Sequence, residues 1–267
     1  MSRIDEAFAR AKAEGRVAFI AYLMAGYPEP DATVAIAKAL ADGGADAIEI
    51  GLPFSDPLAD GATIQRASMK ALEGGMSVLR CPELIREVRA AGVVIPMIVM
   101  TYYNPILAYG QDRFVRDVAA AGADGLIAVD VPPEEAGELA ARCRAESVDL
   151  IPLLAPTSTD ERVALAVEQA SGFIYCVSVA GVTGAREALP EELGAFLERA
   201  RRQTALPLAV GFGISRREHV EALQGRAEGA IVGSALVDLI EAAPRAERET
   251  RVREYVEVLT GHGTSRL

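Results

Sequence analysis

The chain has 267 residues, of which 51% are hydrophobic and 24% charged. This is the composition of an ordinary globular protein, and it excludes disordered, collagen-like and low-complexity chains. The 27 Lys and Arg against 38 Asp and Glu give a net charge of −11. An acidic chain without a basic stripe is a poor candidate for binding nucleic acid or an anionic membrane.

Neither the longest apolar run nor the cysteines point to a membrane or an oxidising compartment. Residues 90–100 form that run, which is shorter than the ~20 residues that a membrane helix needs. The N-terminus lacks the apolar segment of a secretory signal. The cysteines are odd in number and widely spaced, without a disulfide framework or zinc motif: Cys81, Cys143 and Cys176. We therefore expect a cytoplasmic protein with buried, reduced thiols.

Apolar periodicity predicts strands and helices in alternation along the chain. The first elements are a helix over 4–12 and a buried strand over 17–23. Further strands are expected at 47–51, 95–101, 125–130, 149–154, 173–178, 207–211 and 230–233. Amphipathic helices lie between them, among them 31–42, 134–146, 160–170 and 190–203, and a final surface helix is expected at 247–260.

Three segments repeat one pattern, in which a glycine is followed by a small residue, an acid and a short apolar run: 41–51, 119–129 and 225–233. The glycine suits a helix C-cap, and the run suits a strand that is buried on both faces. Eight such αβ units predict a parallel sheet closed into a barrel. We predict one α/β domain over 1–267, a (β/α)8 TIM barrel with an extra N-terminal helix that covers its bottom. An open doubly wound sheet is the alternative, although residues 22–28 (YLMAGYP) lack its usual phosphate fingerprint.

The second predicted strand, residues 47–51 (AIEIG), contains an acid among apolar residues. Because side chains alternate along a strand, Ile48 and Ile50 share one face and Glu49 lies on the other. The isoleucines suit the helix shell of a barrel, which points Glu49 into the interior. A carboxyl group there needs partners or a raised pKa. We interpret Glu49 as a general acid or base, with an internal structural hydrogen bond as the alternative.

Two more acids follow in the loop 51–61, GLPFSDPLADG. Asp56 stands before a proline, which is a turn signal, and Asp60 is placed to cap a helix that starts near Ala62. Asp60 has a second interpretation, since Glu49 and Asp60 on one strand–loop element can be held in different environments. Such a split allows one carboxyl group to act as acid while the other stays ionised.

Glycines follow the seventh and eighth predicted strands, in 210–215 (VGFGIS) and 231–235 (IVGSA). Glycines that lead from these strand ends into helices form the common phosphate site of barrels. Their amides can approach an anion closely, and the helix dipole adds a favourable field. The loop 178–190 (SVAGVTGAREALP), which follows the sixth strand, is interpreted as a mobile lid or as an ordinary long loop.

Scarce residue types narrow the chemistry. The three lysines, Lys12, Lys38 and Lys70, all fall in predicted helices, which disfavours a Schiff-base aldolase. The two histidines, His219 and His262, lie in a helix and near the C-terminal end, so we expect neither a catalytic metal nor Ser–His catalysis. Carboxylate acid–base chemistry on a phosphorylated substrate remains.

Residues 48–61, IEIGLPFSDPLADG, closely resemble the signature of the tryptophan synthase alpha subunit family. The resemblance covers nearly the whole chain and extends to ATIQ at 62–65, GVTGAR at 181–186, GFGIS at 211–215 and VGSA at 232–235. It implies a lyase of the carbon–oxygen class (tryptophan synthase). Its alpha subunit cleaves indole-3-glycerol phosphate to indole and glyceraldehyde 3-phosphate by retro-aldol chemistry, in tryptophan biosynthesis.

The resemblance also implies roles for single residues. Glu49 is expected to protonate C3 of the indole and then to take the proton of the side-chain hydroxyl. Asp60 is expected to face the indole N–H, with Tyr175 near Glu49 and Thr183 closing onto Asp60. Tyr22, where phenylalanine is frequent in the family, is expected to flank the indole together with Tyr102 and Phe212. The phosphate is expected at Gly184, Gly213, Gly233 and Ser234.

The family further implies a partner. The alpha subunit associates with a beta subunit in an α2β2 heterotetramer, and indole passes between them through a tunnel. Pyridoxal phosphate belongs to the beta subunit, so we predict no cofactor and no metal for this chain. The loop with Asp56 and the region 103–107 are the expected contact surfaces. Two alternatives remain, a sugar-phosphate isomerase that uses two carboxylates and a barrel subunit that mainly activates a partner.

Overall fold

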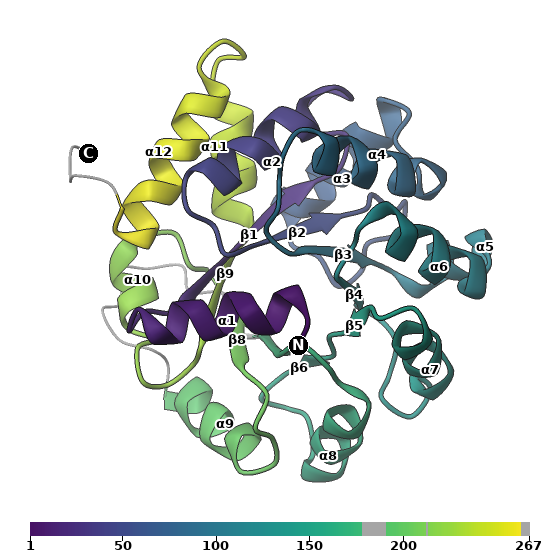
Figure 1. Ribbon diagram of the computed structural model, residues 1–267, viewed down its shortest axis with the longest axis vertical. Helices are drawn as coiled ribbons and strands as arrows, with labels where there is room; N and C mark the ends of the chain where they lie inside the picture. Colours follow the sequence, from purple (N-terminus) through teal and green to yellow (C-terminus); the bar gives the residue numbers. More distant parts are fainter. Residues whose placement is uncertain (178–190, 212, 263–267) are drawn as a thin grey trace.

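The computed structural model describes residues 1–177, 191–211 and 213–262. Its centre is one sheet of parallel strands surrounded by helices (Figure 1). The strands follow one another in the order β5-β4-β3-β2-β1-β9-β8-β7-β6. They are β1 Ala18–Met24, β2 Ala47–Gly51, β3 Met97–Thr101, β4 Gly125–Ala128, β5 Asp149–Leu150, β6 Leu153–Leu154, β7 Ile174–Val177, β8 Leu208–Gly211 and β9 Gly229–Val232.

The two ends of this sheet are halves of one segment of the chain, residues 149–154. The N–H of Ile151 donates to the carbonyl of Leu126 at 3.0 Å, which continues the pairing of β5 with β4. The carbonyl of Pro152 accepts from the N–H of Tyr175 at 3.1 Å, which continues the pairing of β6 with β7. The sheet therefore closes on itself as a barrel. The single strand expected at 149–154 is instead two short ones, because proline has no N–H to donate.

The helices of the described residues include one in each of the ranges predicted above. They are α1 Arg3–Ala13, α2 Ala32–Asp42, α3 Ala62–Glu73, η1 Val78–Arg80, α4 Cys81–Ala90, α5 Tyr103–Tyr109, α6 Gln111–Ala121, α7 Gly137–Ala145, α8 Asp160–Gln169, α9 Glu191–Arg201, α10 Arg217–Glu221, α11 Ser234–Ala242 and α12 Arg248–Thr260. One boundary differs clearly from its prediction, since α7 begins at Gly137 rather than at 134. Residues 133–136 form a turn after Pro132 instead.

Helix α1 closes the face of the barrel that is turned toward the viewer in Figure 1. It begins with a capping box in which the Ser2 hydroxyl and the Asp5 carboxylate each accept the other residue's N–H. Its apolar face inserts Ile4 and Phe8 among the inward side chains of the strands. The Phe8 ring lies 5.4 Å from that of Phe173. This end of the barrel is therefore filled, and the cavity described below opens at the other end.

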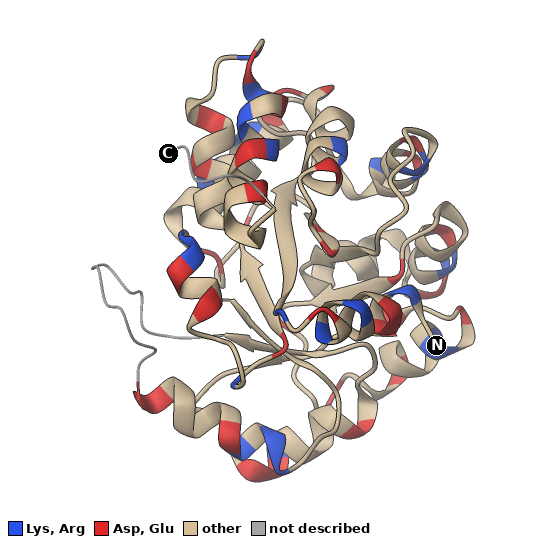
Figure 2. Ribbon diagram, turned by 60° about the vertical axis from the view of Figure 1, so that its left-hand side comes forward, with Lys and Arg blue, Asp and Glu red and all other residues tan. Residues whose placement is uncertain are grey.

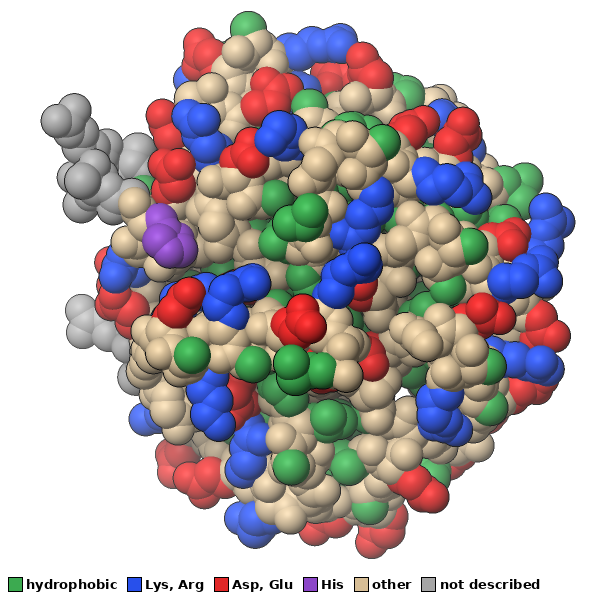
Figure 3. All heavy atoms as spheres, in the orientation of Figure 1, with side chains coloured by type: hydrophobic (Ala, Val, Ile, Leu, Met, Phe, Trp, Pro, Cys, Tyr) green, Lys and Arg blue, Asp and Glu red, His purple; other side chains and the backbone are tan. Residues whose placement is uncertain are grey.

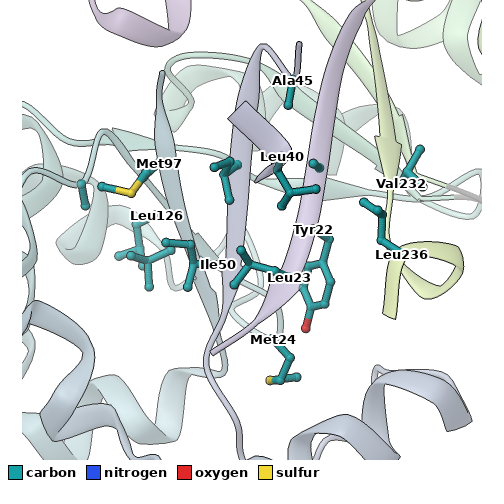
Figure 4. Close-up of a cluster of buried hydrophobic side chains, with 14 of the residues drawn as sticks. Tyr22, Leu23, Met24, Leu40, Ala45, Ile50, Met97, Leu126, Val232 and Leu236 are labelled. Carbon is teal, nitrogen blue, oxygen red and sulfur yellow. The ribbon is translucent and has the colours of Figure 1, made fainter. Parts of the chain in front are cut away.

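A second, larger core lies between the strands and the helix shell. Figure 4 shows Leu23 and Ile50, from β1 and β2, together with Leu40 of α2 and Leu236 of α11. Ile48 belongs to the same outer cluster, whereas Ala47 faces the barrel interior. The alternation predicted for residues 47–51 is therefore confirmed, and position 49 points inward.

The acid of the repeated glycine–acid segments links neighbouring strands. In each case its carboxylate accepts the N–H of a residue in the preceding strand of the barrel, at 2.8 Å: Phe19 to Asp46, Met97 to Asp124 and Leu208 to Glu228. Each carboxylate also pairs with an arginine, namely Arg16, Arg89 and Arg201 respectively. The pattern read as an αβ repeat is thus also a repeated ionic connection at the base of the barrel.

Charged residues lie mainly on the helices and loops around the strands (Figure 2). On the face that carries α1, basic and acidic side chains are interspersed (Figure 3). No helix within the described ranges is long and apolar enough to span a membrane.

Candidate active site

A cavity of about 430 Å³ opens at the carboxyl ends of the strands. It collects predicted site residues from distant parts of the chain: Tyr22, Glu49, Asp60, Tyr175, Gly213, Gly233 and Ser234. Tyr102 stands behind it and contacts Asp60. Thr183, Gly184 and Phe212 lie outside the described residues.

Glu49 is the most enclosed ionisable group of this cavity. Its residue is 1% exposed, and among the described residues neither carboxyl oxygen has a hydrogen-bond partner. Burial, and secondarily the negative charge of Asp60, raise the pKa of Glu49 to about 8. At neutral pH the group therefore carries its proton, and it is placed to donate that proton inside the cavity.

Asp60 occupies a different environment on the following loop. The hydroxyl of Tyr102 donates to its Oδ2 at 3.1 Å, and the same hydroxyl accepts the N–H of Ala59 at 2.9 Å. Burial raises the pKa of Asp60, while the Tyr102 hydrogen bond favours its ionised form. Gly61 rather than Asp60 is the N-cap of α3, so the capping interpretation of Asp60 is wrong. The two nearby carboxyl groups thus differ, since Asp60 has a hydrogen-bond donor and Glu49 has none in the part of the chain that the structure describes.

Two tyrosine rings lie inside the barrel because the neighbouring strand offers a glycine. A Cβ on Gly51 would overlap the hydroxyl of Tyr22, and a Cβ on Gly211 would overlap the hydroxyl of Tyr175. Burial raises the pKa of both tyrosines well above the ordinary value, so their hydroxyls stay neutral donors. Sequence reasoning placed both tyrosines at the site but missed that these glycines admit the rings.

The opposite wall of the cavity consists of backbone at the start of a helix. Gly233 is the N-cap of α11 and Ser234 its first residue. Gly213, with a φ of +47°, lines the same wall after β8. The first amides of a helix have no intrahelical acceptors and carry its positive dipole end, which suits a phosphate.

Other lining residues follow from the same geometry. Met100, Gly211 and Ile231 are inward positions near the ends of β3, β8 and β9, and Thr63 and Ile64 belong to the first turn of α3. Period-two counting from the strand ends identifies the first three. Asp56 lies outside the cavity, exposed, and accepts a hydrogen bond from the Ser55 hydroxyl. Within the described part of the chain, no cluster of three or more His, Cys, Asp or Glu is arranged to hold a metal ion.

Comparison with known proteins decides the family. The family model described as tryptophan synthase alpha chain matches residues 8–263. A tryptophan synthase alpha chain from Roseiflexus castenholzii is 56% identical over 261 residues, which are 98% of this chain and 100% of that protein. The chain belongs to the tryptophan synthase alpha chain family.

Solved structures agree with this assignment. The alpha subunit from Legionella pneumophila superposes with a TM-score of 0.90 at 35% identity and covers 98% of both chains. A chain of the tryptophan synthase complex from Pyrococcus furiosus gives a TM-score of 0.83 at 38% identity, over 92% of this chain and 99% of that one. The fold predicted from strand–helix alternation, a TIM barrel, is therefore confirmed.

Proposed function

We propose that Glu49 and Asp60 divide the acid–base work by which this alpha chain, a lyase of tryptophan biosynthesis, cleaves indole-3-glycerol phosphate to indole and glyceraldehyde 3-phosphate. The observation that supports this division is the contrast between the two carboxyl groups. Glu49 is buried, has no hydrogen-bond partner among the described residues and is protonated at neutral pH, whereas Asp60 receives the Tyr102 hydrogen bond. Environments that separate two titratable groups in this way assign acid and base roles.

The reaction begins with proton transfer from Glu49 to C3 of the indole ring. The ring nitrogen then carries the positive charge, and ionised Asp60 stabilises it through the N–H. Glu49, now a carboxylate, takes the proton of the hydroxyl on the side-chain carbon bonded to C3. The C–C bond breaks, its electron pair returns to the ring, and the oxygen becomes the carbonyl of glyceraldehyde 3-phosphate. Protons and electrons balance without a metal or a covalent intermediate.

The remaining predicted residues orient the substrate. Backbone at Gly213, Gly233 and Ser234 receives the phosphate, with Gly184 as a further expected contact. Tyr22, Tyr102 and Phe212 flank the indole, Tyr175 lies beside Glu49, and Thr183 closes onto Asp60. The distance between the helix terminus and the two carboxyl groups is then spanned by the glycerol chain.

The chain works with a beta subunit, as expected for an alpha subunit of an α2β2 heterotetramer. The two candidate contact surfaces each present an exposed apolar side chain, Leu58 (92% exposed) on the Asp56 loop and Leu107 (53% exposed) on α5. The complete synthase would be classed as a carbon–oxygen lyase, although the step assigned to this chain breaks a carbon–carbon bond. The cytoplasmic location expected from the sequence stays a prediction.

The test is a product analysis with indole-3-glycerol phosphate, with the beta subunit present but without serine. Wild type should release indole and glyceraldehyde 3-phosphate in equal amounts. Asp60→Asn keeps the shape but loses the charge, and it should lower the rate about 100-fold, the scale of a lost charge-stabilising group. Asp42→Asn on the exposed face of α2 is the control, since Asp42 lies away from the cavity and pairs with Lys38 of the same helix. An Asp60→Asn enzyme as fast as the control contradicts the assigned role, and isomerisation of an aminoaldose phosphate would favour the isomerase alternative.

A further inference from the structure

A proton donor as buried as Glu49 raises the question of what stabilises it after the proton has left. The carboxylate that forms has no hydrogen-bond donor among the described residues in the resting arrangement. An ionised carboxylate in such a place is costly unless donors reach it. The ionisable groups that face Glu49 are Asp60, Tyr22, Tyr175 and, through Asp60, Tyr102.

Two of these groups cannot serve. Asp60 has only acceptor oxygens when it is ionised. The Tyr102 hydroxyl already donates to Asp60 and accepts from the N–H of Ala59. The hydroxyls of Tyr22 and Tyr175 remain, and both line the cavity. The hydrogen bonds of the described residues use neither hydroxyl, so each has a proton to give.

Strand geometry favours Tyr22 over Tyr175. Tyr22 of β1 is the register partner of Glu49 on the neighbouring strand β2, so the two side chains point to the same side of the sheet. The Tyr22 hydroxyl takes the space that a side chain at Gly51 would fill. Gly51 is the next inward position of β2 after Glu49. The hydroxyl therefore lies one inward position closer to the carboxyl end of β2 than Glu49 does. Tyr175, on β7, also lies near Glu49, whose charge acts on it, but its hydroxyl takes the space at Gly211 of β8, a strand that does not neighbour β2 in the sheet.

We propose that the Tyr22 hydroxyl donates the hydrogen bond that holds Glu49 once Glu49 has given its proton to the substrate. Tyr22 is thus a positioning residue that acts through Glu49, in addition to the contact of its ring with the indole. This inference rests on the proposed role of Glu49. It separates two contributions of one side chain, since the ring packs against substrate while the hydroxyl acts only on the charged form of Glu49.

The inference fixes the sign of a measurable shift. Because Glu49 must start protonated, kcat/KM falls as the pH rises through its pKa. A hydrogen bond to the carboxylate favours the ionised form and lowers this pKa, so its removal moves the alkaline limb to higher pH. A hydrogen bond to a charged group corresponds to roughly one to two pH units, and to about 10- to 100-fold in kcat. KM should change much less, because phenylalanine keeps the ring.

The experiment compares pH profiles of kcat and kcat/KM for wild type, Tyr22→Phe and Tyr175→Phe, with the beta subunit present. A ¹³C NMR titration of the Glu49 carboxyl carbon provides a readout that does not depend on turnover. Tyr109→Phe is the matched control, because its hydroxyl binds Asp117 between α5 and α6. Tyr22→Phe should move both the alkaline limb and the NMR titration upward and lower kcat, whereas the control should match wild type.

Each other outcome has a definite meaning. Unchanged titration and kcat in Tyr22→Phe overturn the inference, and so does a change confined to KM, which would leave the ring as the only contribution. A shift in Tyr175→Phe but not in Tyr22→Phe overturns it in favour of the other tyrosine. Glu49→Gln is measured in parallel, to distinguish a failure of the proposed function from a failure of the proposed role of Tyr22. If Glu49→Gln keeps the wild-type alkaline limb, the proposed function itself fails; if it removes the limb while Tyr22→Phe does not shift it, only the role of Tyr22 fails.

Discussion

Replacement of Gly51 by alanine tests how closely strand packing and catalysis are connected in this barrel. The added Cβ would overlap the Tyr22 hydroxyl and lie 2.6 Å from Cζ and 2.8 Å from Cε2 of the ring. Ordinary contact begins at 3.4 Å, so Cζ must retreat by about 0.8 Å. The backbone of β2 holds the new methyl group in place, so the ring must move, and the cavity that Tyr22 lines is the open space beside it.

The displacement has two consequences of predictable size. Overpacking a core in this way costs roughly 1–3 kcal/mol, which for a domain of this size lowers Tm by about 2–10 °C. The ring also enters the space for the indole, and misplacement of a group at a site by about 1 Å can reduce the rate 100-fold. We expect kcat/KM for indole-3-glycerol phosphate to fall about 10- to 100-fold.

The measurements are thermal melting and steady-state indole release. Gly137→Ala serves as the control, because nothing lies within 4 Å of a Cβ at that first residue of α7. The double variant Gly51→Ala/Tyr22→Phe lacks the oxygen that overlaps most, and it should recover part of the lost Tm. If Gly51→Ala melts and turns over like the control, the close approach of Tyr22 to β2 is not a constraint and the packing argument is refuted.

Three further predictions concern the carboxyl groups. The pKa of Glu49 is about 8 in the folded protein, against about 4.3 when unfolded, so the contribution of this group to stability is full below pH 4 and is lost as the pH rises toward 8. The Tm of Glu49→Gln should therefore rise relative to that of wild type between pH 5 and pH 9. A Tm difference that stays constant over this range would contradict the raised pKa. Tyr102→Phe removes the hydrogen-bond donor of Asp60, so the pKa of the Asp60 carboxyl group, measured by NMR, should rise and indole release should slow several-fold. An unshifted NMR titration of Asp60 would contradict this prediction. Asp124→Asn breaks the buried contact with Arg89 and should lower the free energy of unfolding in urea by about 3 kcal/mol. The exposed control Asp42→Asn should lower it by less than about 0.5 kcal/mol. Equal losses in the two variants would mean that the buried pair does not stabilise the fold.

Sequence patterns predicted what depends on local periodicity. The alternation in AIEIG was enough to place Glu49 inside and Ile50 outside, because a strand has only two faces. The glycines after β8 and β9 were expected at one end of the barrel for a similar reason, since strand ends of a parallel barrel meet at one face, and Gly213 and Gly233 do line one cavity. Their role in binding phosphate stays a prediction.

What the sequence did not predict depends on contacts between distant segments. The division of residues 149–154 into β5 and β6 reflects pairing with two different strands, since Ile151 bonds to β4 and Pro152 to β7. Pro152 marks the break in the sequence but does not reveal these partners. Gly51 and Gly211 make room for tyrosines of other strands, so their importance is visible only once β1 meets β2 and β7 meets β8. The capping role considered for Asp60 was wrong because Gly61 is the N-cap of α3. The Asp60 carboxylate instead accepts a hydrogen bond from Tyr102, 42 positions along the chain.

Indole release by Glu49→Gln is the most direct test of the central claim. The substitution is nearly isosteric and removes only the ability to give and take a proton. With indole-3-glycerol phosphate and a matched beta subunit, wild type should turn over and the variant should be slower by about 100-fold or more, the usual scale of lost general acid–base catalysis. A variant that releases indole at the wild-type rate would show that another group moves the proton. An inactive wild type that still raises beta-subunit activity would make this chain a regulatory partner instead.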